Sequence, residues 1–306
     1  MGDLLRVKLP DDGPFGEAWV LSDREDHASV VAEGAHAGRT IRELMEQFPT
    51  EILGTLATRF RRFPLLLKFL DVKKMLSVQV HPSNAETELI PPGETGKTEA
   101  WVVLEADQDS RVYAGLKPDV SAADLRDAIN TGSVADQLSS FTPNVGDAVF
   151  LKAGTVHALG RDIVVFEVQQ NSDVTFRLFD WDHIDEKTGK PRPLQVDQAL
   201  ACIDYREGPV GPVTPAIEGT TSSARERLFA CEHFSLWRRS GQSPFIVGNR
   251  DRARVVTCID GLGHVEHDGT KYDLNTGDVM LLPAVVGACS FEPSGRVTLL
   301  EVALPE

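Results

Sequence analysis

Two histidines and one carboxylate lie in or beside stretches that favour β-strands, and together they could bind a metal ion. The first stretch, Leu76–Pro82, carries Gln79 and His81 two residues apart, so on a strand their side chains share one face. Glu99 follows directly before an apolar run, and His157 comes later in the segment Gly-Thr-Val-His-Ala. Two histidines and one carboxylate are a typical ligand set for a catalytic divalent metal, with zinc favoured.

The residues around these candidates form short apolar runs separated by proline, glycine, asparagine and aspartate. Such runs predict strands that alternate with turns. We expect strands at Phe15–Ser22, Phe63–Val72, Met75–His81, Thr98–Leu104, Arg111–Gly115, Ala148–Lys152 and Ile163–Gln170. Many short strands with turns between them indicate an antiparallel sandwich or barrel.

Helical patterns interrupt these strands. Arg39–Phe48 carries its apolar residues on one side of a helix. Ser121–Phe141 has apolar residues at helical spacing and Ser121 as an N-cap candidate, so we expect a small helical insert there. We expect another short helix at Gln195–Ile203, and a linker at Arg206–Ser223, which is rich in glycine, proline and threonine.

The second half of the chain repeats a pattern of the first half. The segment Gly146–Ala153 matches Gly277–Ala284, and both begin with Gly-Asp followed by apolar residues. When the two segments are aligned, His157 corresponds to Ala288. The second copy therefore keeps the strand pattern but lacks this candidate metal ligand. The match is short, and chance similarity of two β-hairpins is the alternative.

These patterns predict a mainly β fold of two jelly-roll modules with a small helical insert. We expect an N-terminal strand and helix segment over residues 1–60 and a metal-binding module over 61–205, with the insert at about 121–141. A linker and a second, degenerate module are expected over 206–306. The chemistry is therefore assigned to the first module.

Composition narrows the class of partner. The chain has 306 residues, 42% of them hydrophobic, and a formal charge of -15, which argues against nucleic acid or an anionic membrane as partner. An anionic substrate would therefore need a few lysines or arginines at its binding site.

The four cysteines lack the spacing of a structural metal site. The chain does not begin with a signal-peptide pattern, and no apolar run is long enough to span a bilayer. We therefore expect a cytoplasmic protein.

Five ordered motifs resemble those of type I mannose-6-phosphate isomerases, and the short bacterial branch in particular. The motifs are Gly-Glu-Ala-Trp at residues 16–19, Ser-Val-Gln-Val-His-Pro at 77–82, Gly-Lys-Thr-Glu at 96–99, Gly-Thr-Val-His-Ala at 154–158 and Glu-Val-Gln-Gln-Asn-Ser-Asp-Val-Thr-Phe-Arg at 167–177. The resemblance implies a two-cupin enzyme that interconverts mannose 6-phosphate and fructose 6-phosphate with one zinc. It implies Gln79, His81, Glu99 and His157 as ligands, although water could replace the Gln79 amide.

The same resemblance suggests roles for four further residues. Glu167 shares a strand face with Val165, so it should point into the barrel, where burial would raise its pKa. The family implies Glu167 as the acid/base, Arg177 as the group that holds oxygen charge, and Lys97 and Ser77 as binders of the phosphate, with Lys97 also linked to proton transfer. The alternatives are a structural pair of Glu167 with Arg177, and a solvated Lys97.

Moving a carbonyl between two sugar carbons requires one group to remove a proton and return it through an enediol. A metal can polarise the sugar oxygens during this transfer. We therefore expect a small-molecule sugar phosphate as partner and a monomer or homodimer. Two rivals stay open: another metal cupin, such as an iron-dependent oxygenase, and a non-catalytic module that binds sugar phosphates.

Overall fold

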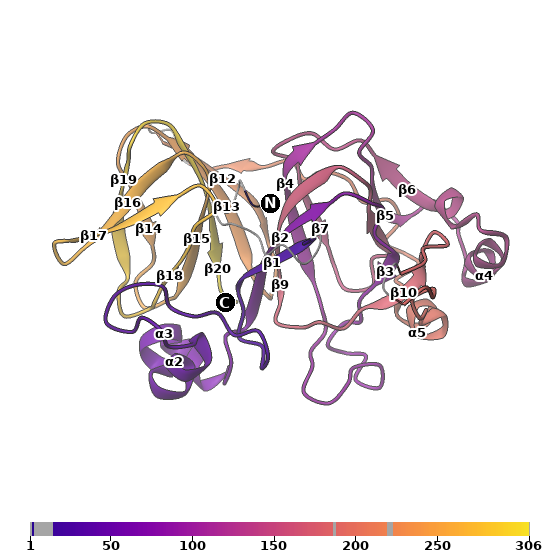
Figure 1. The fold of residues 1–306 in the computed structure, drawn as a ribbon, viewed down its shortest axis with the longest axis horizontal. Helices are drawn as coiled ribbons and strands as arrows, with labels where there is room; N and C mark the ends of the chain where they lie inside the picture. The colour runs from indigo at the N-terminus through magenta and orange to yellow at the C-terminus, as the bar shows by residue number, and fades with distance from the viewer. Residues whose placement is uncertain (1, 3–14, 186–187, 219–222, 306) are drawn as a thin grey trace. The chain divides into compact units, whose positions relative to one another are not determined.

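Short antiparallel strands dominate the computed structural model, which describes residues 2, 15–185, 188–218 and 223–305. The strands group into two units (Figure 1). The central unit comprises residues 16–18 and 67–213, and the terminal unit comprises the described parts of 19–66 and 214–305. The predicted mainly β fold with two jelly-roll modules is confirmed.

The boundaries of the units differ from those expected. The Ala284 N–H donates to the Ile52 carbonyl over 2.9 Å, so part of the expected N-terminal segment belongs to the terminal unit. The Val213 N–H donates to the Ala148 carbonyl over 2.8 Å, and the central unit therefore continues past residue 205. Single backbone hydrogen bonds of this kind leave no period in the sequence. Residues 1, 3–14 and 219–222 of the expected segments lie outside the described residues.

Two five-stranded sheets build the central unit (Figure 1). The first has the order β1-β2-β9-β4-β7, with β1 at Glu17–Leu21, β2 at Leu65–Val72, β9 at Ile163–Gln170, β4 at Glu99–Ala106 and β7 at Ala148–Leu151. The second has the order β10-β3-β8-β5-β6, with β10 at Phe176–Phe179, β3 at Val78–Val80, β8 at His157–Leu159, β5 at Val112–Leu116 and β6 at Leu138–Phe141. The sequence missed β8 and β10 because each is short.

One apolar core joins the two sheets of the central unit. It contains Val165 of β9 and Trp101 of β4 from one sheet, and Val112 of β5 from the other. Side chains two residues apart on a strand share a face, so Glu167 continues the inward face of Val165. Only 4% of Glu167 is exposed, which agrees with the predicted inward position.

Helices cover the outer side of the second sheet. Helix α5 (Val196–Cys202) packs on β10 and β3, and α4 (Ala122–Thr131) contributes to the same apolar cluster as Val78 and Leu178. The predicted helix at Gln195–Ile203 is thus confirmed. The predicted insert is helical only in part, because after α4 and the 3-10 turn η2 (Val134–Gln137) the chain forms β6 and pairs with β5.

The terminal unit has one six-stranded and one four-stranded sheet. The first has the order β11-β12-β13-β20-β15-β18, with β11 at Ala216–Ile217, β12 at Ser223–Ala230, β13 at Ser235–Gly241, β20 at Val297–Ala303, β15 at Arg254–Asp260 and β18 at Val279–Leu282. The second has the order β14-β19-β16-β17, with β14 at Phe245–Gly248, β19 at Ala288–Pro293, β16 at Leu262–His267 and β17 at Thr270–Asn275.

The remaining helices belong to the terminal unit. Helix α2 (Ile41–Gln47) confirms the predicted helix at Arg39–Phe48 and begins at the capping residue Thr40. It is followed by α3 (Pro49–Leu53) and the 3-10 turn η1 (Gly54–Thr58), which are too short to show a period. No helix among the described residues is long and apolar enough to cross a membrane.

The repeat seen in the sequence is a repeat of position in the fold. Leu151 of β7 pairs with Glu99 of β4, and its counterpart Leu282 of β18 pairs with Arg254 of β15. Both pairs lie at one edge of their sheet. Strand register therefore relates Glu99 of the central unit to Arg254 of the terminal unit.

The start of α4 offers a test of the helical insert. Ser121 Oγ accepts a hydrogen bond from the Asp124 N–H, while the Asp124 carboxylate accepts one from the Ser121 N–H over 2.8 Å. We expect Ser121→Ala to lower the free energy of unfolding by about 1 kcal/mol, because the Asp124 N–H at the helix end loses its acceptor. Urea unfolding followed by circular dichroism measures this, with Ser121→Thr as the control. Equal stability of Ser121→Ala and wild type would contradict the capping role.

Candidate metal centre

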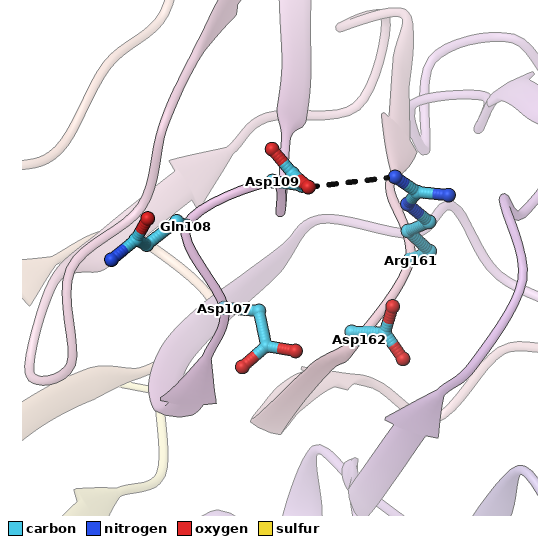
Figure 2. A pocket seen from close by; sticks show the side chains of 5 residues that line it. All are labelled: Asp107, Gln108, Asp109, Arg161 and Asp162. Atoms are coloured by element: carbon cyan, nitrogen blue, oxygen red, sulfur yellow. Dashed lines mark ion pairs between the residues drawn. The ribbon is translucent and has the colours of Figure 1, made fainter.

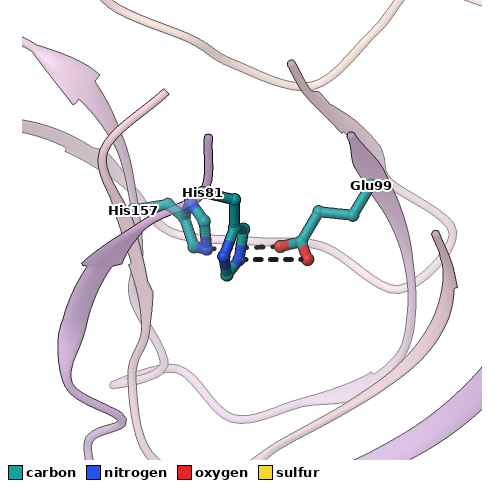
Figure 3. Close-up of side chains that lie close together, drawn as sticks. All are labelled: His81, Glu99 and His157. Atoms are coloured by element: carbon teal, nitrogen blue, oxygen red, sulfur yellow. Dashed lines mark ion pairs between the residues drawn. The ribbon is translucent and has the colours of Figure 1, made fainter. Parts of the chain in front are cut away.

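His81, Glu99 and His157 meet in the interior of the central unit, where each is at most 2% exposed. Figure 3 shows both imidazoles turned toward the Glu99 carboxylate. His81 Nε2 lies 3.4 Å from Glu99 Oε2, and His157 Nε2 lies 3.2 Å from Glu99 Oε1. One ligand atom from each residue lies within 4.8 Å of the others, so a single ion could contact all three.

Strand ends bring these residues together. Gln79 of β3 is paired directly with His157, the first residue of β8, and His81 follows one residue after β3 ends. Glu99 is the first residue of β4 in the facing sheet. Directly paired residues present their side chains to one face, so β3 and β8 deliver their ligands to the same side.

The backbone fixes which nitrogen of each imidazole faces Glu99. His81 Nδ1 lies 2.8 Å from the Val174 carbonyl, and His157 Nδ1 lies 2.8 Å from the Thr155 carbonyl. A carbonyl oxygen can only accept, so each Nδ1 carries the proton and each Nε2 presents a lone pair to the carboxylate. This is the usual second contact of a metal-binding histidine.

Three buried acceptors therefore face one another. Glu99 Oε1 accepts no hydrogen bond from any described residue, although the Lys97 ammonium lies 2.8 Å from Oε2 as an ion pair. A buried acceptor without a donor is costly. A divalent cation between the imidazoles and the carboxylate would satisfy all three groups, so the residues present fit a metal ion.

Gln79 adjoins this cluster. Its amide Nε2 lies 3.2 Å from His157 Nε2. The two ends of an amide are assigned from the surrounding hydrogen bonds, and a half-turn would present the oxygen instead. Gln79 is thus within reach of the site, with either its amide oxygen or a water as a further ligand.

Lys97 is part of the cluster and is not solvated, because only 4% of it is exposed. Its Nζ lies 2.8 Å from Glu99 Oε2 and 3.3 Å from His81 Nε2. Burial favours the neutral amine, but the charges of Glu99 and then Glu167 outweigh it and raise the pKa of Lys97. A charged ammonium therefore lies beside the candidate ligands.

The electrostatics keep the candidate ligands in their metal-binding forms. Burial would raise the pKa of Glu99, but Lys97, His81 and His157 outweigh it and lower that pKa well below its usual value. Burial, and then the Lys97 charge, lower the pKa of His81 to about 3. Burial also lowers the pKa of His157. At neutral pH the site therefore offers a carboxylate and two neutral imidazoles.

Glu167 lies on the neighbouring strand with a different set of partners. The Trp101 Nε1–H donates to Glu167 Oε2 over 2.9 Å, and the same indole packs edge-on against His157. Burial, and then the Glu99 charge, raise the pKa of Glu167 despite the opposing charges of Lys97 and Lys68. Its Oε1 accepts no hydrogen bond from the described residues.

Arg177 and Ser77 lie around the cluster without touching it. Arg177 of β10 is paired with Gln79, and its buried Nε donates no hydrogen bond to a described residue. No ion pair joins Arg177 to Glu167 in the described part of the chain, so the structural Glu-Arg pair considered above does not form. Ser77 is buried just before β3, with 3% exposed.

Sequence reasoning missed Lys68, a buried cation on the inner side of β2. Its Nζ lies 3.7 Å from Glu167 Oε1 and 3.4 Å from Glu17 Oε2. The available signal was its place in the apolar run Leu-Leu-Leu-Lys-Phe-Leu at residues 65–70, where a charge needs a partner.

A separate pocket lies on two turns of the central unit and contains none of these residues. Figure 2 shows Asp107, Gln108, Asp109, Arg161 and Asp162 around it, with Arg161 ion-paired to Asp109 at 3.7 Å. Most of these side chains are exposed to solvent. A solvated acidic turn of this kind does not compete with the buried cluster as a candidate metal centre.

Comparison with known sequences links the chain to one group of enzymes. The family model for the phosphomannose isomerase type I catalytic domain matches residues 2–130. Mannose-6-phosphate isomerase ManA of Bacillus subtilis is 33% identical over 285 residues, which cover 90% of this chain and 86% of the relative. Mannose-6-phosphate isomerase of Streptococcus mutans is 31% identical over 302 residues, covering 95% and 90%.

Solved structures share the fold. The crystal structure of mannose 6-phosphate isomerase from Bacillus subtilis has a TM-score of 0.89 at 28% identity, covering 98% of this chain and 93% of that one. A variant phosphomannose isomerase from Salmonella typhimurium has a TM-score of 0.77 at 18% identity, covering 100% and 95%. The second likeness concerns the fold alone.

The lowered histidine pKa values predict acid sensitivity of the metal-free protein. The pKa of His81 is about 3 in the folded protein, compared with about 6.5 for an unperturbed histidine. The neutral imidazole therefore stabilises the folded state fully above pH 6.5, and this stability is lost as the pH falls from 6.5 toward 3. Between pH 7 and pH 5, His81 should account for a loss of about 2 kcal/mol. Between pH 7 and pH 5, we therefore expect the free energy of unfolding to fall by about 2 kcal/mol less in His81→Gln than in wild type.

Denaturant unfolding of metal-stripped protein at the two pH values measures this difference. His36→Gln, which changes an exposed histidine of the terminal unit, is the matched control and should behave as wild type. Identical pH dependence in wild type and His81→Gln would contradict the buried, neutral state of His81.

Proposed function

The chain belongs to the type I phosphomannose isomerase family, and we propose that its buried His81-Glu99-His157 cluster is the metal centre at which it isomerises a sugar phosphate. The reaction is the interconversion of mannose 6-phosphate and fructose 6-phosphate, the activity named for its relatives. The observation that carries the proposal is the convergence of two imidazole lone pairs on one buried carboxylate.

We infer zinc as the metal, one ion per chain, because two imidazoles and one carboxylate match its preferred donors. His81, Glu99 and His157 would hold it, with Gln79 or water as a further ligand. When bound, such an ion polarises sugar oxygens and stabilises negative charge that develops on them. Trp101 is buried and packs against His157, so it helps to keep bulk water away from the ligands.

Proton transfer is assigned to Glu167. The reaction removes a proton from the carbon beside a carbonyl and returns one to the neighbouring carbon, so one group must accept and then donate. The raised pKa of Glu167 brings it closer to neutral pH, where a carboxyl can do both. The Trp101 indole holds Glu167 Oε2 and leaves Oε1 without a hydrogen bond from the described residues.

Cationic groups would hold the anionic parts of the substrate. Lys97 is charged and buried beside Glu99, and the buried Nε of Arg177 has no acceptor among the described residues. We assign Arg177 to the oxygen charge of the transition state, Lys97 to substrate binding and proton transfer, and Ser77 to the phosphate. These cations supply local positive charge in a chain whose formal charge is -15.

Family membership favours an isomerase over the iron-dependent oxygenase and the non-catalytic module considered above. Both rivals could use the metal ligands, but neither requires a buried carboxyl with a raised pKa close to them. A cytoplasmic location and a monomeric or homodimeric state remain predictions. Cell fractionation and analytical ultracentrifugation would check them.

Removal of the metal tests the centre. We expect metal-stripped protein to lose the conversion of mannose 6-phosphate to fructose 6-phosphate and to regain it with zinc. His157→Ala should lose about 100-fold or more in activity, because one ligand is removed and the others cannot replace it. A coupled assay for fructose 6-phosphate, with metal content measured in parallel, checks both; His36→Ala is the control. Full activity without any divalent metal would contradict the proposal.

Replacement of the acid/base tests the proton path. We expect Glu167→Gln to lower kcat by about 100-fold or more while zinc content stays the same, because the amide keeps its shape but cannot take the proton. The matched control is Glu17→Gln, since Glu17 is the other carboxylate beside Lys68 and is half-exposed. A kcat for Glu167→Gln equal to that of Glu17→Gln would exclude Glu167 as the shuttle.

A further inference from the structure

Strand β17 forms one edge of the four-stranded sheet in the terminal unit. The sheet order β14-β19-β16-β17 gives it a single neighbour, β16. Figure 1 shows β17 at the outer margin of this unit. Residues 270–273 are all exposed, although successive side chains of a strand point to opposite faces of the sheet. Neither face of this part of β17 is therefore buried.

The turn before β17 determines which of its backbone groups point away from β16. Asp268 and Gly269 both have positive φ and connect the paired residues His267 and Thr270, as in a two-residue β-hairpin. The two residues that flank such a turn bond to each other, and bonded and non-bonded pairs then alternate along the ladder. Every second residue of β17, starting with Lys271, therefore directs its N–H and C=O away from β16.

Lys271 and Asp273 are the exposed residues of this outward series. Their outward N–H and C=O groups exchange no hydrogen bond with any described residue. Asn275, the next residue of the series, donates its N–H to Asp278 Oδ2 over 2.8 Å, which agrees with the outward direction. The exposed part of β17 thus offers donors and acceptors to a further strand.

The charges of β17 are complementary to those of a second copy of β17. In a two-fold antiparallel register centred on Tyr272, Lys271 of each copy lies opposite Asp273 of the other. Their outward backbone groups also meet in this register, as an antiparallel ladder requires. A register centred on Lys271 would oppose two lysines, and one centred on Asp273 would oppose two aspartates. Like charges directly opposite are unfavourable, so the charges favour the register centred on Tyr272.

Tyr272 itself lies at the centre of the favoured register. It is 38% exposed, although it shares a strand face with the buried core residue Leu274. The two tyrosines would form a non-hydrogen-bonded pair, in which opposite side chains approach most closely. Aromatic pairs across strands stabilise a sheet, so a second copy would cover both exposed rings.

We propose that β17 pairs with β17 of a second copy of this chain, about a two-fold axis at Tyr272. The four-stranded sheets of the two copies then form one continuous sheet. The contact is isologous, so the same surface of each copy is used and no further copy can add. It is also small, and such contacts dissociate on dilution. The contact lies wholly in the terminal unit and does not depend on the proposed function of the metal centre.

Reversal of charge tests the pairing. Sedimentation velocity of the zinc-loaded protein should show the average mass rising toward that of two chains between about 1 µM and 1 mM. Lys271→Asp opposes like charges at both symmetric positions and should weaken association about tenfold or more. The double variant Lys271→Asp/Asp273→Lys restores opposite charges and should restore association. Circular dichroism checks that each variant keeps its strands.

A disulfide tests the register. Residues opposite each other in a non-hydrogen-bonded pair have Cα atoms about 4.5 Å apart, within reach of a disulfide. Tyr272→Cys should therefore form a covalent dimer under mild oxidation. Thr270→Cys is the matched control, because Thr270 lies opposite Leu274 of the second copy and not opposite itself. Wild type controls for the four native cysteines.

Three results would each overturn the proposal. The first is wild-type protein with the mass of one chain throughout the concentration range, which is expected if the charges of β17 protect a bare edge from pairing. The second is association that Lys271→Asp leaves unchanged or that the double variant fails to restore. The third is a disulfide that forms as readily in Thr270→Cys as in Tyr272→Cys.

Discussion

The convergence of two neutral imidazoles on one buried carboxylate is the constraint on which the central unit depends. Each imidazole donates a hydrogen bond from its Nδ1–H to a backbone carbonyl, so both Nε2 lone pairs face Glu99. Acceptors that face one another in a buried site need a cation between them. Lys97 supplies part of that charge, and a divalent metal would supply the rest. We propose that Glu167 and Arg177 give the site its chemistry.

The two units show how one strand arrangement can present opposite charges. At equivalent positions the central unit carries Glu99 and the terminal unit carries Arg254, although the flanking strands pair in the same way. Glu167 and Glu301 are both buried, but their partners differ. Glu167 accepts a hydrogen bond from the Trp101 indole, and Glu301 forms an ion pair with Arg239. The fold fixes where side chains meet, while residue type decides which charge is presented at that place.

Much of this could be predicted from the sequence, because strand periodicity and the Gly-Asp repeat are local signals. The candidate ligands His81, Glu99 and His157 are recognisable by residue type and motif, and the structure brings them together. Lys68 was missed because its partner Glu167 is distant in sequence. The charge inversion at Arg254 was also missed, since it is visible only once strand register aligns the two units. Short elements such as β8 left no period to detect.

Anomalous X-ray diffraction at the zinc edge, on crystals of zinc-loaded protein, would locate the metal directly. We expect one strong peak per chain within about 2.0–2.2 Å of His81 Nε2, His157 Nε2 and a Glu99 oxygen. Zinc bound elsewhere in the chain, or no peak between the imidazoles and the carboxylate in crystals of active enzyme, would contradict it.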